Sequence, residues 1–249
     1  MDLKIKDVAE LLSVSETTVR RWLADGKIPA YRLNHQYRFS RIEIENWMMG
    51  CKLKPNEEGI SPFEEKQIYP PLDKKTEEKA PGTQQFALYR AIHQGDVFTD
   101  VAENNKEDLI RSISQDIAQK LRVDAEVLAE MLLDREKLMP TAFNHGIAVP
   151  HTRDSLHQGP FDLIFVVFLK DPIEYGALDG QPVHTLFFLF AISDKAHLHL
   201  LSKIAHLSNS ERTLSFLRSR PDKKAILEYT KEWESHLGCP AELETADRL

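Results

Sequence analysis

The chain has 249 residues, of which 42% are hydrophobic and 29% charged, with a formal net charge of −7. This length and composition predict one or two folded domains and exclude a generally basic nucleic-acid coat protein, so any DNA contact must come from a local patch. No apolar stretch of a signal peptide follows Met1, and the longest apolar runs, Leu163–Leu169 and Leu186–Ile192, are too short to span a bilayer.

The cysteine content also favours an intracellular protein. Cys51 and Cys239 are widely separated and form no ligand pattern. Two such cysteines fit a reducing compartment better than a disulfide framework. We therefore expect a cytoplasmic protein with no membrane insertion and no cofactor.

Four regions follow one another along the chain. Residues 1–50 are short-helical with clustered basic residues, and residues 84–236 alternate helical and strand patterns, which predicts an α/β fold. Between them, residues 51–83 are interrupted by five prolines and by charged pairs, so we interpret them as a linker. Residues 237–249 form a C-terminal tail.

The first 26 residues have helix-turn-helix spacing. An apolar face with helical periodicity comes first, formed by Val8, Ala9, Leu11 and Leu12. Ser15 can cap a second helix that Asp25 and Gly26 close. On this second helix Val19, Trp22 and Leu23 face inward, whereas Thr17, Arg20 and Arg21 face outward. The outward side chains could enter a DNA major groove.

A hairpin, or wing, follows this pair of helices. The segment Tyr31–Phe39 alternates around a turn-compatible Asn34-His35 pair and carries Arg32 and Arg38. A last helix carries Ile44, Trp47 and Met48. Between Thr17 and Arg41 there are six basic residues against one acidic residue, Asp25. Attraction to DNA phosphates requires such a local excess.

Together these elements resemble the winged helix-turn-helix domains of excisionases and the related MerR-type proteins. The resemblance rests on Val8-Ala-Glu-Leu-Leu-x-Val-Ser15, Val19-x-x-Trp22 and Tyr31-Arg-x-x-x-x-Tyr-Arg-Phe39. It implies DNA as a partner, with contacts from Thr17, Arg20, Arg21, Arg32 and Arg38. A homodimer is compatible with this, since many such proteins recognise paired half-sites. The alternative is a helix-turn-helix reused for protein contacts.

Two amphipathic helices open the α/β region. The first has Asn105 as its candidate cap and an apolar stripe that runs from Leu109 to Leu121. The second begins near Asp124 and is expected to bury Val127, Leu128, Met131 and Leu132. Arg135 lies four residues beyond Met131, on the same face. A buried arginine there needs an anion or a carbonyl as its partner.

The octet Gly146 to Arg153 is the most informative segment. An apolar β-rich run is stopped by Pro150, which cannot donate a ladder hydrogen bond, and His151 follows directly. The two long apolar runs after it predict interior strands covered on both faces. Ser193 then introduces a helix with His197 in its first turn.

This region resembles the type 2 enzyme IIA domains (mannitol, fructose and nitrogen-regulatory) of the bacterial phosphotransferase system. The matching pieces are Arg135-Glu136, Thr141, Phe143, Gly146-Ile-Ala-Val-Pro-His151, Leu178-Asp-Gly-Gln-Pro182 and His197-Leu-His-Leu-Leu-Ser202. The resemblance implies a mixed sheet between helices, with His151 as phosphoacceptor. It also places Arg135, which would hold the phosphoryl group, His197 and Thr141 in the catalytic site. The implied partner is the histidine phosphocarrier protein of the system.

The residue types suit phosphoryl transfer. A neutral imidazole is nucleophilic near physiological pH, and its other nitrogen can donate to a carbonyl that holds the tautomer. Arginine complements phosphate oxygens, and the first turn of a helix favours an anion. The loop before His151 departs from the family because Met139, Ala142 and Asn144 replace common glycines, and Thr152 replaces a small residue. A structural histidine in a decayed domain is therefore an alternative.

Metal binding is a further alternative for the histidines. His145, His151 and His157 are evenly spaced, and His197, His199 and His206 lie close in sequence. No carboxylate or cysteine completes a recognised ligand pattern, so we predict no metal site.

These observations predict a cytoplasmic regulatory protein, with a DNA-binding module and a domain that carries phosphohistidine rather than acting as a conventional enzyme. Two other functions remain open. One is a phosphocarrier for a separate sugar permease. The other is a binding or sensor protein that is never phosphorylated.

Overall fold

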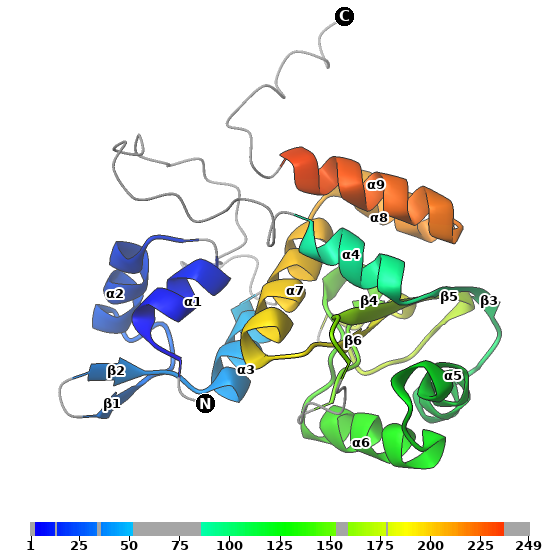
Figure 1. Ribbon diagram of the computed structural model, residues 1–249, viewed down its shortest axis with the longest axis horizontal. Helices are drawn as coiled ribbons and strands as arrows, with labels where there is room; N and C mark the ends of the chain where they lie inside the picture. Colours follow the sequence, from blue (N-terminus) through cyan, green and yellow to red (C-terminus); the bar gives the residue numbers. More distant parts are fainter. Residues whose placement is uncertain are drawn as a thin grey trace, which may run out of the picture.

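The computed structural model describes residues 3–12, 14–33, 36–51, 86–152, 159–177 and 179–236 (Figure 1). The predicted linker at 51–83 lies outside the described residues except for Cys51, and the predicted tail at 237–249 lies outside them entirely. No helix of the described segments is both long and apolar enough to cross a membrane.

The N-terminal module is a small helical domain with a two-stranded hairpin. Its elements are α1 (Ile5–Leu11), α2 (Glu16–Ala24), β1 (Tyr31–Leu33), β2 (Gln36–Arg38) and α3 (Arg41–Cys51). Ser15 caps α2 as expected, since its Oγ accepts a hydrogen bond from the Thr18 amide at 3.1 Å. Val8, Val19, Trp22, Phe39 and Ile44 are buried in its core. The predicted helix-turn-helix and wing are therefore confirmed as structure.

The larger domain is built on a mixed four-stranded sheet in the order β3-β5-β6-β4. Its strands are β3 (Val97–Val101), β4 (Ile147–Ala148), β5 (Leu163–Ile173) and β6 (Val183–Phe190). The central pair β5–β6 is antiparallel, whereas β3 and β4 each run parallel to their neighbour. The two apolar runs are the interior strands, as expected, although β6 begins three residues earlier than its apolar run because Val183 and Thr185 already alternate inward.

Helices cover both faces of this sheet. They are α4 (Ala87–Gln94), α5 (Lys106–Leu121), α6 (Ala125–Leu138), α7 (Asp194–Leu207), α8 (Glu211–Arg218) and α9 (Lys223–His236). Figure 1 shows α5 and α6 on one side and the other four helices on the opposite side, and a separate apolar cluster fills each interface. The predicted α/β fold is confirmed. Leu128 and Leu132 are buried as expected, in the apolar cluster that α6 shares with α5. The expected burial of Val127 is wrong, since Val127 is 53% exposed, and Met131 is only half-buried.

The N-terminal module packs against the larger domain through α7. Both α1 and α3 contact α7, and the buried apolar cluster of the module is continuous with that of the α7 side of the sheet (Figure 1). Among the ion pairs that span the contact, Arg41 Nη1 lies 2.7 Å from Asp194 Oδ1 and Lys195 Nζ lies 2.5 Å from Glu10 Oε2. Residues more than 100 positions apart thus meet at the first turn of α7.

Candidate functional site

His151 lies at the edge of the sheet, held by backbone hydrogen bonds on both sides. The Val149 amide donates to the Thr141 carbonyl at 3.0 Å, and the Leu189 amide of β6 donates to the Pro150 carbonyl at 2.9 Å. Proline lacks an amide hydrogen but keeps its carbonyl, so it ends the strand without breaking this link. The backbone around His151 is therefore anchored, and its side chain is only 1% exposed.

The ring of His151 presents one particular nitrogen to the site. Its Nδ1 lies 2.7 Å from the Val149 carbonyl oxygen and must donate to it, since a carbonyl can only accept. The tautomer is thereby assigned, and Nε2 is left as the nitrogen that can carry a nucleophilic lone pair.

Arg135 projects from the last turn of α6 toward that nitrogen. Its Nη1 donates to the Met139 carbonyl at 2.9 Å, and its Nε lies 3.1 Å from His151 Nε2. The side chain is 4% exposed. A guanidinium held this way by its own helix end is oriented toward any anion bound at Nε2.

His197 completes the histidine pair from the first turn of α7. Ser193 caps that helix by accepting from the Ala196 amide at 3.2 Å. The His151 and His197 rings meet edge to face with centroids 4.8 Å apart. Burial lowers the pKa of His197 to about 4, and a hydrogen bond to Glu45 offsets this only in part. His197 is thus a neutral hydrogen-bond donor beside the positive end of the α7 dipole.

The sequence reasoning missed a fourth residue, Glu45, which arrives from α3 of the N-terminal module. Its Oε1 lies 2.6 Å from His151 Nε2, and its Oε2 lies 3.2 Å from His197 Nε2. Arg135 donates to the same Oε1 through Nε at 3.2 Å and through Nη2. Glu45 is 2% exposed. One carboxylate therefore contacts three of the four residues predicted for the catalytic site, His151, Arg135 and His197.

Glu45 is ionised in this arrangement. Burial alone would raise its pKa, but attraction to His151 and hydrogen bonds from both histidines outweigh burial and hold the pKa well below its usual value. An ionised oxygen 2.6 Å from Nε2 requires a proton on that nitrogen. With Oε1 of Glu45 hydrogen-bonded to it, Nε2 offers no free lone pair for attack in this arrangement.

The only signal for Glu45 in the sequence was its position. It follows the buried Ile44 and precedes the buried Met48 by three residues, so it borders the apolar stripe of α3. That pattern is common on surface helices, so it predicts no binding partner for the Glu45 carboxylate.

Thr141 takes part in the site through its neighbours. Its amide donates to Glu136 Oε2 at 3.2 Å and its hydroxyl donates to Glu136 Oε1, while its carbonyl accepts from Val149. Burial raises the pKa of Glu136, against the effect of the bonds from Thr141. Thr141 and Glu136 thus brace the strand whose Val149 carbonyl orients His151.

No carboxylate completes a ligand pattern with these histidines in the sequence, but in the structure Glu45 of the N-terminal module lies beside two of them. Ligand atoms of Glu45, His151 and His197 all lie within 4.8 Å of one another. The same Glu45 oxygen, however, also accepts from Arg135, whose charge opposes a divalent cation. The donor set fits an anion or a shared proton better than a metal ion.

The elements that carry the predicted DNA-contacting residues, α2, β1 and β2, lie on the side of the module away from the sheet (Figure 1). Thr17, Arg20 and Arg21 of α2 and Arg32 of β1 are exposed, whereas Arg38 is half-buried and donates to Gln36 Oε1 at 2.7 Å. Arg41, counted in the basic cluster, instead pairs with Asp194 of the larger domain. The candidate DNA face therefore centres on α2.

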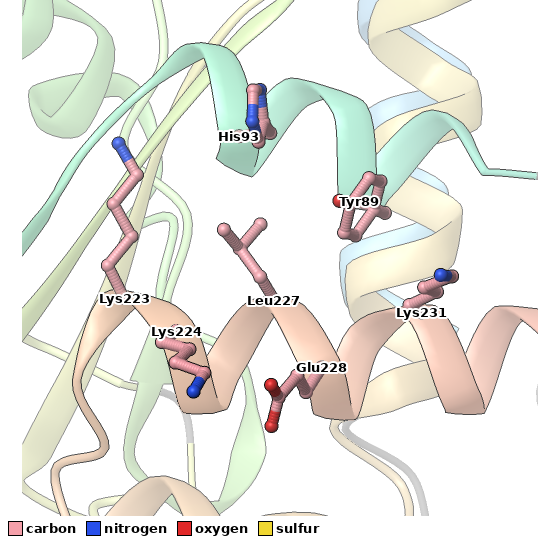
Figure 2. A pocket seen from close by; sticks show the side chains of 7 residues that line it. All are labelled: Tyr89, His93, Lys223, Lys224, Leu227, Glu228 and Lys231. Atoms are coloured by element: carbon pink, nitrogen blue, oxygen red, sulfur yellow. The ribbon is translucent and has the colours of Figure 1, made fainter.

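A separate groove lies between α4 and α9, and Figure 2 shows its lining. The residues that line it are Tyr89, His93, Lys223, Lys224, Leu227, Glu228 and Lys231. Lys223 is already bonded to the Gly95 carbonyl at 2.8 Å and to Asp96 at 3.2 Å. The groove contains none of the residues around His151.

Two known families match the chain. Residues 91–233 match the family described as "Phosphoenolpyruvate-dependent sugar phosphotransferase system, EIIA 2". Residues 3–52 match a family described as "Helix-turn-helix domain". The two matches correspond to the larger domain and the N-terminal module.

Individual relatives agree with the first of these matches. The chain is 34% identical over 142 residues to a nitrogen regulatory protein of Pseudomonas aeruginosa, which covers 56% of this chain and 91% of that protein. It is 30% identical over 133 residues to the fructose-specific EIIABC component of Bacillus subtilis, covering 52% of this chain and 20% of that protein.

A solved structure has the same fold. The nitrogen regulatory protein IIA-Ntr of Neisseria meningitidis matches with a TM-score of 0.50 at 21% identity, covering 57% of this chain and 94% of that one. Fold, family match and relatives agree, and the resemblance predicted from the sequence is confirmed. The chain belongs to the EIIA 2 family of the phosphoenolpyruvate-dependent sugar phosphotransferase system and carries an additional helix-turn-helix domain at its N-terminal end.

Proposed function

We propose that this protein is a cytoplasmic regulator in which His151 accepts a phosphoryl group from the histidine phosphocarrier protein and the N-terminal module binds DNA. The observation that carries the proposal is the position of Arg135 and His197 beside His151: Arg135 Nε lies 3.1 Å from His151 Nε2, and the His197 ring meets the His151 ring edge to face. Nε2 is the nitrogen that the Val149 carbonyl leaves available.

The transfer is a displacement at phosphorus. The lone pair of His151 Nε2 forms a bond to phosphorus while the bond between phosphorus and the donor histidine nitrogen breaks, and that nitrogen recovers its electron pair. Arg135 neutralises the charge on the transferring oxygens, and His197 donates a hydrogen bond. Nδ1 keeps its proton on the Val149 carbonyl throughout.

Intact-mass analysis tests the phosphoacceptor. The full chain is incubated with enzyme I, the histidine phosphocarrier protein and phosphoenolpyruvate, and we expect one acid-labile phosphate on the wild type and none on His151→Ala. The matched control is His93→Ala, which removes an exposed histidine from α4 and should retain the phosphate. An unmodified wild type beside a phosphorylated reference IIA protein would refute the proposal.

The DNA part of the proposal rests on the exposed cations of α2 and on the helix-turn-helix family match. The second helix of such a motif enters the major groove, and its basic side chains contact phosphates or base edges. A regulatory role is also consistent with relatives named nitrogen regulatory protein.

A second candidate function is a phosphocarrier that passes the group to a sugar permease. The identity to the fructose-specific EIIABC component favours it. Transfer of labelled phosphate from the phosphorylated chain to a purified IIB domain would support this function. Retention of the label on the chain in the presence of each IIB domain would support the regulator.

A further inference from the structure

The side chain of Glu45 belongs to one module and its binding site to the other. On α3 it stands beside buried core residues, yet its carboxylate reaches past the module surface to Arg135, His151 and His197. A buried carboxylate is tolerated only where charges and hydrogen bonds compensate it, and in the described part of the chain the groups that bond to Glu45 belong to the larger domain. The docked position of the module therefore depends on this anion site.

The site holds Glu45 as it would hold a phosphoryl group. The carboxylate accepts from a guanidinium and from a histidine in the first turn of α7, where the helix dipole favours an anion. Its Oε1 lies 2.6 Å from His151 Nε2, on the side from which a phosphorus atom would have to bond. The two anions cannot occupy this position together.

We propose that Glu45 is an internal occupant of the phosphate site, so that docking of the N-terminal module and phosphorylation of His151 exclude each other. This inference rests on the proposed function of His151. When α3 withdraws, the proton between Nε2 and Oε1 passes to solvent and the lone pair of Nε2 becomes available. After transfer, the phosphoryl group holds Arg135 and His197, and its negative charge repels Glu45.

The other contacts between the modules fit a reversible dock. Besides the apolar packing on α7, the described residues form two further ion pairs across the contact. The pair of Lys195 and Glu10 is largely exposed and contributes little by itself, whereas in the pair of Arg41 and Asp194 the side chains are 12% and 35% exposed. The helix that would enter DNA is not covered in the docked state, because Arg20 and Arg21 remain exposed. Phosphorylation would thus change where the module sits relative to the larger domain, rather than uncover α2.

The test compares Glu45→Gln with Glu43→Gln in the full chain. Glutamine has the shape of glutamate but lacks its charge, and Glu43 is a matched control on the same helix that bonds to Tyr31 within the module. We expect the phosphocarrier protein to phosphorylate Glu45→Gln about tenfold faster or more than the wild type, because the rate scales with the undocked fraction. Glu43→Gln should match the wild type.

A distance measurement gives an independent readout. Spin labels at Ala24 on α2 and Lys224 on α9, with the two native cysteines replaced, report the separation of the modules. We expect a narrow distribution in the unphosphorylated wild type and in Glu43→Gln. A broad distribution is expected in Glu45→Gln and in wild type that mass analysis shows to be phosphorylated.

The outcomes separate the two claims. A narrow distribution in phosphorylated wild type, or equal phosphorylation rates for wild type and Glu45→Gln, would overturn the exclusion while leaving His151 as phosphoacceptor. Absence of phosphate from all three proteins, beside a phosphorylated reference protein, would overturn the proposed function together with the exclusion. Glu45→Ala, which removes the carboxyl group altogether, should behave as Glu45→Gln does.

Discussion

Two cationic regions of this molecule handle charge in opposite ways. On α2, Arg20 and Arg21 are exposed, and Arg20 Nη2 lies 3.8 Å from the exposed carboxylate of Glu16. At the phosphate site, Arg135 is buried, donates to a carbonyl and a carboxylate, and lies beside His151. Solvent screens the first region, whereas the second works at low dielectric with its geometry already set.

Because their arginines differ in burial, the two regions should recognise different anions. Exposed arginines attract any polyanion, with an affinity that depends on salt and is spread over several side chains. A buried, oriented arginine selects a small anion at one position and cannot be moved without cost. Single changes should therefore matter greatly at the phosphate site and modestly on α2 and at exposed contacts.

The largest effect is expected at Arg135. Arg135→Lys keeps the charge but loses the planar fork, so we predict that phosphorylation of His151 slows about 100-fold. Initial rates with the phosphocarrier protein measure this, and Arg212→Lys, at an arginine whose side chain is 75% exposed, is the control. If Arg135→Lys kept the wild-type rate, the buried site would be no more sensitive to a single substitution than the exposed face of α2.

Acid stability provides the second test of the buried site. The pKa of His197 is lowered from 6.5 to about 4 in the folded chain. Between pH 6.5 and pH 4, this histidine is therefore protonated in the unfolded chain but still neutral in the folded chain. The free energy of unfolding therefore keeps the full contribution of His197 above pH 6.5 and loses it as the pH falls toward 4. Between pH 7 and pH 5 we expect it to fall by ~2 kcal/mol.

Denaturant unfolding at the two pH values, compared between wild type and His197→Gln, isolates this contribution. The variant should lose ~2 kcal/mol less than the wild type over the same interval. An identical loss in both proteins would show that His197 titrates normally in the folded chain and is not desolvated.

On the exposed face we predict a smaller effect. Arg20→Ala combined with Arg21→Ala should weaken DNA binding roughly tenfold near physiological salt and make the slope of log affinity against log salt shallower by about two. Lys224→Ala with Lys231→Ala removes the same charge from α9 and should change neither quantity. Equal weakening by both double variants would mean that net charge, not the α2 face, determines binding.

The smallest effect is expected at the exposed contact between the modules. Lys195→Ala removes an ion pair whose side chains are 47% and 37% exposed, so it should change docking by at most about 1 kcal/mol. The spin-label distribution should stay narrow, in contrast to that of Glu45→Gln. If Lys195→Ala released the module, the exposed ion pair with Glu10, and not the buried carboxylate of Glu45, would stabilise the docked state.

Local patterns predicted most of the elements and the histidine site. Caps at Ser15, Asn105, Asp124 and Ser193 and the unbroken apolar runs of β5 and β6 are short-range signals, and the structure agrees with them. Predictions of burial and pairing were wrong for individual side chains where these depend on packing between elements. Val127 is exposed and Arg41 is paired with Asp194, because which face of α6 or α3 meets another element cannot be inferred from periodicity alone.

The two domain families, the mixed α/β architecture and the candidate phosphoacceptor could be predicted from the sequence, because motif residues and hydrophobic periodicity are local properties of the chain. The contact between Glu45 and His151 could not, because 106 positions separate the two residues. The Glu45 carboxylate is compensated by a guanidinium and two imidazoles of the other domain. Which groups it contacts therefore depends on how the two domains pack, not on the local sequence of α3.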